Sequence, residues 1–247
     1  MPRYFIEVAY KGARYSGFQV QQNANSVQAE VSKALSVFYR RPFELTGSSR
    51  TDAGVHALQN FFHFDSEAPL KDERYHLNAI LPPDIVINSI KEVKPDAHAR
   101  FDALSREYGY YLYAHKDPFL EDRAYYYPYA LDVDRLKEAA AELMLHEDFT
   151  SFSKRNSQVH TFNCRLFISK WEQEGNNMVY TVEGNRFLRG MVRGLVGTML
   201  QVGKGKLSLE AFRNIITAKD CTKADFAVPA HGLFLRKVNY PAIISND

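Results

Sequence analysis

The chain has 247 residues, of which 45% are apolar and 24% are charged, and its net charge is +2. This composition supplies enough apolar material for a packed core and excludes a disordered chain and a strongly basic, charge-driven coat for nucleic acid. A balanced total charge still permits a local basic groove.

The cysteine count and the apolar runs limit the class of protein further. Only two cysteines occur, Cys164 and Cys221, which excludes a disulfide framework and a zinc ribbon. No apolar run approaches the roughly 20 residues of a membrane span, and the first residues resemble a strand more than a secretory signal. We therefore expect a reduced, soluble, cytoplasmic protein.

The first half of the sequence predicts the element order β-α-β-β-α-β. Residues 4–10 alternate as in a strand, and apolar residues recur at helical spacing after a candidate N-cap at Asn25–Ser26. The predicted elements are a strand over 4–10, a helix from residue 27, strands over 43–46 and 58–65, a helix over 70–81 and a strand over 85–93. This order is typical of the ferredoxin-like fold.

The second half repeats the order of elements without repeating the sequence. The predicted elements are a strand over 107–114, a helix over 133–146, strands over 163–173 and 178–183 around a turn at 175–177, helices over 187–201 and 209–218, and a strand over 232–240. We predict an α+β fold of two ferredoxin-like, RRM-like (βαββαβ) domains, residues 1–103 and 104–247. They are expected to join into an extended, mainly antiparallel sheet, with helices on one face and a cleft between the halves.

The segment 47–57 combines small residues with Arg50, Asp52 and His56 between two predicted strands. Small residues let the backbone approach another molecule closely, and an aspartate there can act as a nucleophile or a general base. The alternative is that Asp52 is an ordinary turn residue, because Asp-Ala-Gly is common in turns. On spacing alone the turn is favoured.

The predicted helix 187–201 is apolar or small almost all round, which is typical of a buried helix. Arg189 and Arg193 nevertheless stand one turn apart on one face. A cation beside a buried helix either extends to solvent or pairs with a buried carboxylate. Three glycines, Gly190, Gly194 and Gly197, weaken a helix by roughly 1 kcal/mol each, which the close approach of a neighbouring element would offset.

A third segment, residues 98–113, interleaves arginines with tyrosines, a pattern that suits phosphates and base faces. Tyr108 and Tyr110 share one face of the predicted strand, and Tyr111 and Tyr113 share the other. At least one of these sets is expected to be core, because strands are rich in aromatic residues.

Motifs for metals and nucleotide cofactors are missing from the sequence. The eight histidines form no pair at metal-ligand spacing, and His56 and His63 are expected to be hydrogen-bonded structural residues. Neither a phosphate-binding P-loop nor a dinucleotide-binding glycine motif occurs. We therefore predict no cofactor and no metal.

Residues 50–57, Arg-Thr-Asp-Ala-Gly-Val-His-Ala, resemble the signature of the tRNA pseudouridine synthase A family. Further segments resemble the family in the same order along nearly the whole chain: residues 17–19 and 26–28, 78–82 with Ile85, 98–101 with 106–108, 148–152, 185–197 and 232–240. An ordered set is far more specific than one octet, so the resemblance favours a catalytic role for Asp52.

The resemblance implies an enzyme that isomerises uridine to pseudouridine in the anticodon arm of tRNA, as a homodimer and without cofactor or metal. The family's essential aspartate falls on Asp52 and its active-site tyrosine on Tyr108. The arginine that pairs with the aspartate falls on Arg193, and the arginine linked to base flipping falls on Arg50. Residues 153–165 depart from the family pattern. The resemblance therefore does not indicate which basic residues of this segment touch tRNA.

This chemistry agrees with the residues themselves. Asp52 can attack C1′ of the ribose or remove a proton from C2′ to give a glycal, and the sequence leaves both routes open. Either route needs an ionised carboxylate in a sheltered pocket, a form that a nearby guanidinium such as that of Arg193 favours.

Two other functions are compatible with an α+β fold of this kind. A non-catalytic RNA-binding protein with two RRM-like domains would carry the aromatic RNP pattern on a central strand, and the sequence has no such run. A metabolic enzyme on the same scaffold would have no affinity for tRNA, since fold alone does not fix function.

Overall fold

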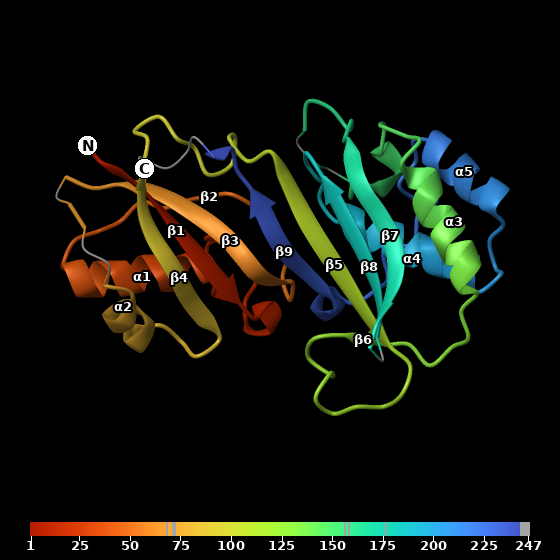
Figure 1. The fold of residues 1–247 in the computed structure, drawn as a ribbon, viewed down its shortest axis with the longest axis horizontal. Helices are drawn as coiled ribbons and strands as arrows, with labels where there is room; N and C mark the ends of the chain where they lie inside the picture. The colour runs from red at the N-terminus through yellow and green to blue at the C-terminus, as the bar shows by residue number, and fades with distance from the viewer. Residues whose placement is uncertain (68, 71–72, 156, 158, 176, 243–247) are drawn as a thin grey trace. The chain divides into compact units, whose positions relative to one another are not determined.

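The structure, a computed structural model, describes residues 1–242 other than 68, 71–72, 156, 158 and 176. It is a mixed α+β fold with mainly antiparallel strands (Figure 1). In chain order, the strands and α-helices of the described residues are β1 (Arg3–Tyr10), α1 (Val27–Tyr39), β2 (Thr46–Gly47), β3 (His56–Asp65), α2 (Arg74–Ile80), β4 (Ile85–Val93), β5 (Ser105–Tyr113), β6 (Tyr125–Tyr126), α3 (Val133–Leu143), β7 (Leu166–Glu174), β8 (Asn177–Gly184), α4 (Met191–Gly203), α5 (Leu209–Thr217) and β9 (Leu233–Asn239).

The chain folds into two compact units. The first holds Met1–Ser105 together with the chain from Phe234 onward, and the second holds Arg106–Leu233. Most of the last strand therefore belongs to the first unit, although it follows the second unit in sequence. No helix in the described part of the chain is long and apolar enough to cross a bilayer.

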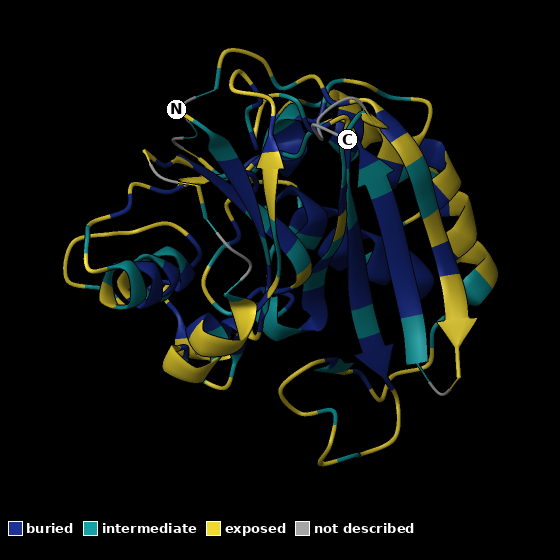
Figure 2. Cartoon of the chain, turned by 60° about the vertical axis from the view of Figure 1, so that its left-hand side comes forward, coloured by how far each residue is buried: buried dark blue, intermediate teal, exposed yellow. Residues whose placement is uncertain are grey.

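In the first unit, β1 lies between β4 and β3 and pairs antiparallel with both. Ile6 is opposite Phe62 on one side and Ile90 on the other. The short β2 pairs antiparallel with β3, and β9 pairs parallel with β3 where His56 meets Phe234. Burial alternates along β9 and at the start of β4, whereas β1 and β3 each bury three consecutive residues. Figure 2 shows exposed residues gathering on loops and outer helix faces.

The first helix of this unit forms as its sequence predicts. The hydroxyl of Ser26 caps α1 by accepting the N–H of Ala29 at 3.3 Å, which satisfies one of the free donors of the first turn. The apolar positions of the helix bury Val31 and Leu35 completely. Each such burial stabilises the fold by about 1.5–3 kcal/mol.

In the second unit, β8 lies between β5 and β7 and pairs antiparallel with both. The two-residue β6 runs parallel to β5, with Leu112 opposite Tyr125. Helix α3 packs against α4, α5 and β7. Trp171 and Tyr180 are fully buried in this core, and their ring centroids are 5.2 Å apart.

The glycines of α4 confirm the expected close approach. A Cβ at Gly194 would lie 2.7 Å from the ring of Phe226, and one at Gly197 would lie 2.2 Å from the main-chain oxygen of Asp225. Side chains at either position would push residues 225–228 away from the helix. The two glycines thus exchange helix propensity for contact with this neighbouring segment.

Several predicted boundaries differ from the structure. The strand predicted over 43–46 is reduced to Thr46–Gly47, and the helix predicted over 187–201 begins only at Met191. Gly190 precedes it with a φ of +72°, a left-handed conformation outside the helix. The helix predicted over 70–81 covers Arg74–Ile80, its residues 71–72 lying outside the described part, as does Asn176 of the predicted turn.

Candidate active site

Asp52 lies on the loop between β2 and β3. Its main-chain oxygen accepts a hydrogen bond from the N–H of Val55 at 3.2 Å and closes a four-residue turn. Gly54 has a φ of +80° in this turn, which glycine adopts without steric cost. The main chain of Asp52 thus fulfils the turn role that the sequence favoured on spacing alone, and its side chain is half-buried.

The loop after β1 contacts the end of the Asp52 loop. The N–H of Gly12 donates to Nδ1 of the buried His56 at 3.1 Å. A Cβ at Gly12 would lie 1.9 Å from the main-chain oxygen of Val55, so only glycine permits this approach. His56 is hydrogen-bonded, as its sequence context predicts, and its ring also stacks on Phe234 with centroids 4.6 Å apart.

A second contact between these loops is made by Phe18. Its N–H donates to the main-chain oxygen of Thr51 at 3.1 Å, and its ring stacks on Phe62 of β3 with centroids 4.6 Å apart. A Cβ at Gly47 would lie 2.3 Å from the Phe18 ring. Aromatic packing therefore fixes the residue that holds Thr51, the neighbour of Asp52 in the chain.

A buried polar network supports the same loop from the sheet. The side chain of Asn60 on β3 donates to the main-chain oxygen of Ser49 at 2.8 Å and to the hydroxyl of Tyr10 at 3.2 Å. The hydroxyls of Tyr10 and Thr51 lie 2.8 Å apart. Sequence reasoning missed both Tyr10 and Asn60, although an asparagine in phase with buried phenylalanines on one strand face was the available signal.

Arg50 is exposed between two buried neighbours. Ser49 and Thr51 have only 7% of their surface accessible, whereas the side chain of Arg50 extends into solvent. A cation on a main chain fixed at both sides is well placed to meet an anionic partner without a large loss of backbone freedom.

Tyr108 is in the second unit, on β5 opposite Val182 of β8. Only 9% of its surface is accessible. Its ring meets that of Phe187 edge to face, with centroids 5.1 Å apart, a favourable geometry for two aromatic rings. On the same strand Tyr110 is completely buried and donates to the main-chain oxygen of Pro229 at 2.8 Å, so this face is core, as expected.

Arg193 lies in the first turn of α4 and is half-buried. Its Nε donates to the main-chain oxygen of Val228 at 2.8 Å, and its Nη2 donates to that of Phe226 at 3.4 Å. These bonds fix the plane of the guanidinium against the segment that Gly194 and Gly197 admit. Arg189, predicted to lie one turn earlier on the same helix face, precedes the helix and is exposed, so the two arginines differ in environment.

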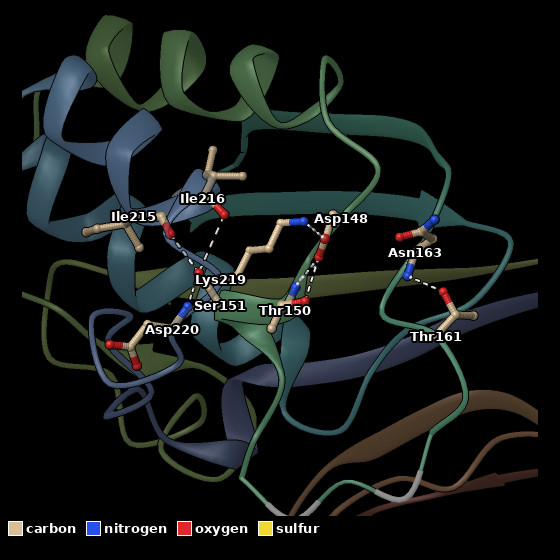
Figure 3. A network of polar contacts seen from close by, with 9 residues as sticks. All are labelled: Asp148, Thr150, Ser151, Thr161, Asn163, Ile215, Ile216, Lys219 and Asp220. Atoms are coloured by element: carbon tan, nitrogen blue, oxygen red, sulfur yellow. Dashed lines mark hydrogen bonds and ion pairs between the residues drawn. The ribbon is translucent and has the colours of Figure 1, made fainter.

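A polar network fastens the loop after α3 to the end of α5 (Figure 3). The carboxylate of Asp148 accepts from the hydroxyl of Thr150 at 2.6 Å and pairs with Nζ of Lys219 at 2.8 Å. The hydroxyl of Ser151 donates to a main-chain oxygen of α5 at 2.6 Å and accepts the N–H of Asp220 at 3.0 Å. Residues 148–152, one of the segments that carry the resemblance, thus anchor this loop.

Two histidines organise the connection between β4 and β5. The rings of His63 and His98 meet with centroids 4.5 Å apart, and Nδ1 of His63 accepts the N–H of Ala99 at 3.1 Å. The hydroxyl of Tyr240 donates to the main-chain oxygen of Ala99 and lies 3.0 Å from the hydroxyl of Ser48. The connection is therefore linked to the start of the Asp52 loop.

A hollow of about 360 Å³ borders the β4–β5 connection and is lined by Lys94, Phe101 and Leu104 among others; the four predicted site residues are not in its lining. Within the described residues, histidine, cysteine and carboxylate side chains form no group of three or more that is suited to a metal ion.

Comparison with known sequences identifies the family. The profile of the family described as tRNA pseudouridine synthase matches residues 6–102 and 139–241. A tRNA pseudouridine synthase A of Porphyromonas gingivalis is 48% identical over 250 residues, covering 98% of both chains. That of Parabacteroides distasonis is 47% identical over 244 residues, covering 98% of this chain and 97% of its own.

More distant relatives keep the same full-length match. A tRNA pseudouridine synthase A of Staphylococcus saprophyticus is 35% identical over 240 residues, covering 96% of this chain and 90% of its own. The profile match and the full-length identities agree with each other and with the order of motifs in the sequence. The chain belongs to the tRNA pseudouridine synthase family.

Proposed function

We propose that the protein isomerises uridine to pseudouridine in the anticodon arm of tRNA, with Asp52 as the essential carboxylate. The observation that carries this proposal is the setting of Asp52. The chain belongs to the family, and its Asp52 lies in a turn. Main-chain contacts hold this turn on one side, and a buried polar network holds it on the other. A carboxylate on such a loop meets its substrate in one geometry.

The reaction first requires the target nucleoside to leave the stack of the anticodon arm, which costs a few kcal/mol. Arg50, exposed beside Asp52, is proposed to hold a phosphate or fill the space of the displaced base. Tyr108 is proposed to stack on the displaced uracil, an interaction worth about 1–3 kcal/mol. Its edge-to-face contact with Phe187 fixes the orientation of its ring.

Asp52 then acts on the ribose. In one route the carboxylate attacks C1′ and the glycosidic bond to N1 breaks, leaving an ester between Asp52 and the ribose; the detached uracil turns, and C5 displaces the carboxylate from C1′. In the other route the carboxylate removes a proton from C2′ while the bond to N1 breaks, giving a glycal; C5 of the turned uracil then bonds to C1′ and the proton returns to C2′. Both routes end with the uracil bonded to C1′ through C5, which loses its proton, while N1 gains one.

Arg193 is proposed to pair with Asp52 and keep it ionised. A guanidinium whose plane is already fixed by the oxygens of Val228 and Phe226 offers a carboxylate preset donors. An arginine fork suits this role better than a lysine, because it can hold both carboxylate oxygens.

The quaternary and domain arrangement completes the proposal. We propose that both halves are ferredoxin-like, supported in the first half by the order β1-α1-β2-β3-α2-β4, and that two chains form a homodimer. Light scattering coupled to gel filtration measures the mass in solution, and a monomer at working concentration would contradict the homodimer.

The direct test uses tRNA transcripts that carry no modifications, with pseudouridine mapped at nucleotide resolution. The wild-type chain is expected to modify the anticodon arm, and Asp52→Asn to be slower by about 10³-fold or more while still binding tRNA. Asp134→Asn, an exposed aspartate at the start of α3, serves as the matched control and is expected to keep full turnover.

The same assay separates the alternative functions. Binding of tRNA without turnover by the wild-type chain would favour a non-catalytic RNA-binding protein. Appreciable turnover by Asp52→Asn would remove this carboxylate from its central role, whatever the substrate.

A further inference from the structure

The chain segment around Asp52 is connected to the sheet by side chains as well as by the main chain. The hydroxyl of Tyr10, the last residue of β1, lies 2.8 Å from the hydroxyl of Thr51. Asn60, on the neighbouring β3, donates to this Tyr10 hydroxyl at 3.2 Å. The polar chain Asn60–Tyr10–Thr51 thus ends at the residue that precedes Asp52.

Asn60 also holds the other side of the loop. Its amide donates to the main-chain oxygen of Ser49 at 2.8 Å, and its side-chain oxygen accepts the N–H of Ser49 at 3.3 Å. One side chain therefore fixes Ser49 directly and Thr51 through Tyr10. The exposed Arg50 and the half-buried Asp52 are the residues whose neighbours are fixed in this way.

The three side chains of this polar network, Tyr10, Thr51 and Asn60, are buried. Asn60 is completely inaccessible, and Tyr10 and Thr51 are 5% and 7% exposed. Placing three polar side chains in a core is unfavourable unless each is hydrogen-bonded, and an apolar residue in phase with Phe62 would fill the position of Asn60 at no such cost. The network instead gives the loop a single well-defined position.

We propose that Tyr10, Thr51 and Asn60 are positioning residues for Asp52, and that their hydrogen bonds set the distance between its carboxylate and the ribose. This inference rests on the proposed role of Asp52 in pseudouridine formation. The three residues touch no substrate; they act through the main chain on either side of Arg50 and Asp52.

The test compares near-isosteric substitutions at fixed temperature well below unfolding. Thr51→Val removes the hydroxyl and keeps the shape, and Thr51→Ser restores the hydroxyl. Tyr10→Phe removes the partner atom. We expect Thr51→Val and Tyr10→Phe to lower kcat by about 10- to 100-fold with KM for tRNA within about twofold of wild type, because a misplaced carboxylate affects chemistry more than binding. Thr51→Ser is expected to regain most of kcat.

Two further variants test whether the effect comes from the hydrogen bond between Tyr10 and Thr51. The double variant of Tyr10→Phe with Thr51→Val is expected to be no slower than the slower single variant, because Tyr10→Phe already removes the hydrogen bond that Thr51→Val removes. Tyr4→Phe is the control: this tyrosine is buried on the same strand, and its hydroxyl accepts the N–H of Leu70 at 3.0 Å, in a different part of the unit. Its kcat is expected to match wild type.

The outcomes distinguish this inference from the proposed function. Unchanged kcat in Thr51→Val and Tyr10→Phe, even with a lowered melting temperature, would overturn the positioning role. So would a rise in KM at constant kcat, or equal loss in Thr51→Ser and Thr51→Val. The proposed role of Asp52 fails by a different result, namely appreciable turnover by Asp52→Asn. The variants of Tyr10 and Thr51 retain Asp52, so their rates do not decide that question.

Discussion

Nε of Arg193 donates a hydrogen bond of 2.8 Å to the main-chain oxygen of Val228. This bond joins the first turn of α4 to the extended segment that precedes β9. The segment lies close to the helix only because Gly194 and Gly197 carry no side chain. A predicted active-site cation and two predicted helix-weakening glycines are therefore parts of one local arrangement.

Substitution of Arg193 is expected to affect both stability and turnover. Arg193→Ala leaves the oxygen of Val228 without this donor, so the free energy of unfolding should fall by about 1–3 kcal/mol in urea titrations. Arg193→Lys retains the charge but not the fork, and we expect it to be more stable than Arg193→Ala yet at least about tenfold slower than wild type. Full activity of Arg193→Lys would contradict the proposed pairing with Asp52.

Acid is expected to destabilise the first unit through His63. Burial, aided by the positive charges that His98 and Arg3 can carry, lowers the pKa of His63 from its usual 6.5 to about 4. Between those values the unfolded chain binds a proton that the native state does not, so stability is fully present above pH 6.5 and falls towards pH 4. The loss amounts to about 3 kcal/mol.

Urea unfolding at several pH values between 7 and 4 checks this expectation. The fall in the free energy of unfolding should begin and end within about half a pH unit of the two pKa values of His63, 6.5 in the unfolded chain and about 4 in the native state. His63→Asn retains an acceptor for the N–H of Ala99 but does not titrate, and its stability should change less over the same interval. His160→Asn, at an exposed position, is the control and should keep the wild-type slope. An equal slope in His63→Asn would assign the acid sensitivity to other groups.

Gly197→Ala is expected to destabilise the second unit despite the better helix propensity of alanine. Its Cβ would lie 2.2 Å from the oxygen of Asp225, and overpacking of this kind costs about 1–3 kcal/mol. Displacing residues 225–228 should also lower kcat by moving the partners of Arg193. Gly175→Asn, in open space at a φ of +61° that asparagine tolerates, should change neither quantity in thermal melts and turnover assays.

The two thiols are expected to react very differently. Cys164 is 1% exposed, and burial raises the pKa of its thiol to about 11, so little reactive thiolate forms at pH 8. Cys221 is partly exposed. Iodoacetamide followed by peptide mass spectrometry should find Cys221 alkylated and Cys164 protected until urea is added. Rapid labelling of Cys164 in the native protein would show that the loop held by Asp148 opens readily.

The sequence predicts a helix or strand best where residues within that element determine its structure. The apolar spacing that begins at Val27 and the cap at Ser26 predict α1, and both are found. The predicted start of α4 was wrong, because Gly190 adopts a left-handed conformation and the helix begins only at Met191. The strand β6 was missed because two residues carry no periodic pattern.

The candidate site divides in the same way. Motif order points to Asp52, Arg50, Tyr108 and Arg193, yet it says nothing of the residues that hold them. Tyr10 and Asn60 are 50 residues apart and meet only because β1 and β3 are neighbours in the sheet. Contacts of this kind depend on register, which a single sequence constrains weakly.

The pairing of β9 with β3 has a consequence for synthesis on the ribosome. Residues up to Ser105 emerge first and contain β1, β3 and β4, but the pairing of β3 with β9 and the contact of Tyr240 with Ser48 await the strand that begins near Phe234. At about 5–20 residues per second, the intervening chain delays that strand by the order of ten seconds. During this interval the nascent first unit carries an open strand edge that a chaperone can cover. A chain that terminates before β9 leaves the same edge of its N-terminal half unpaired.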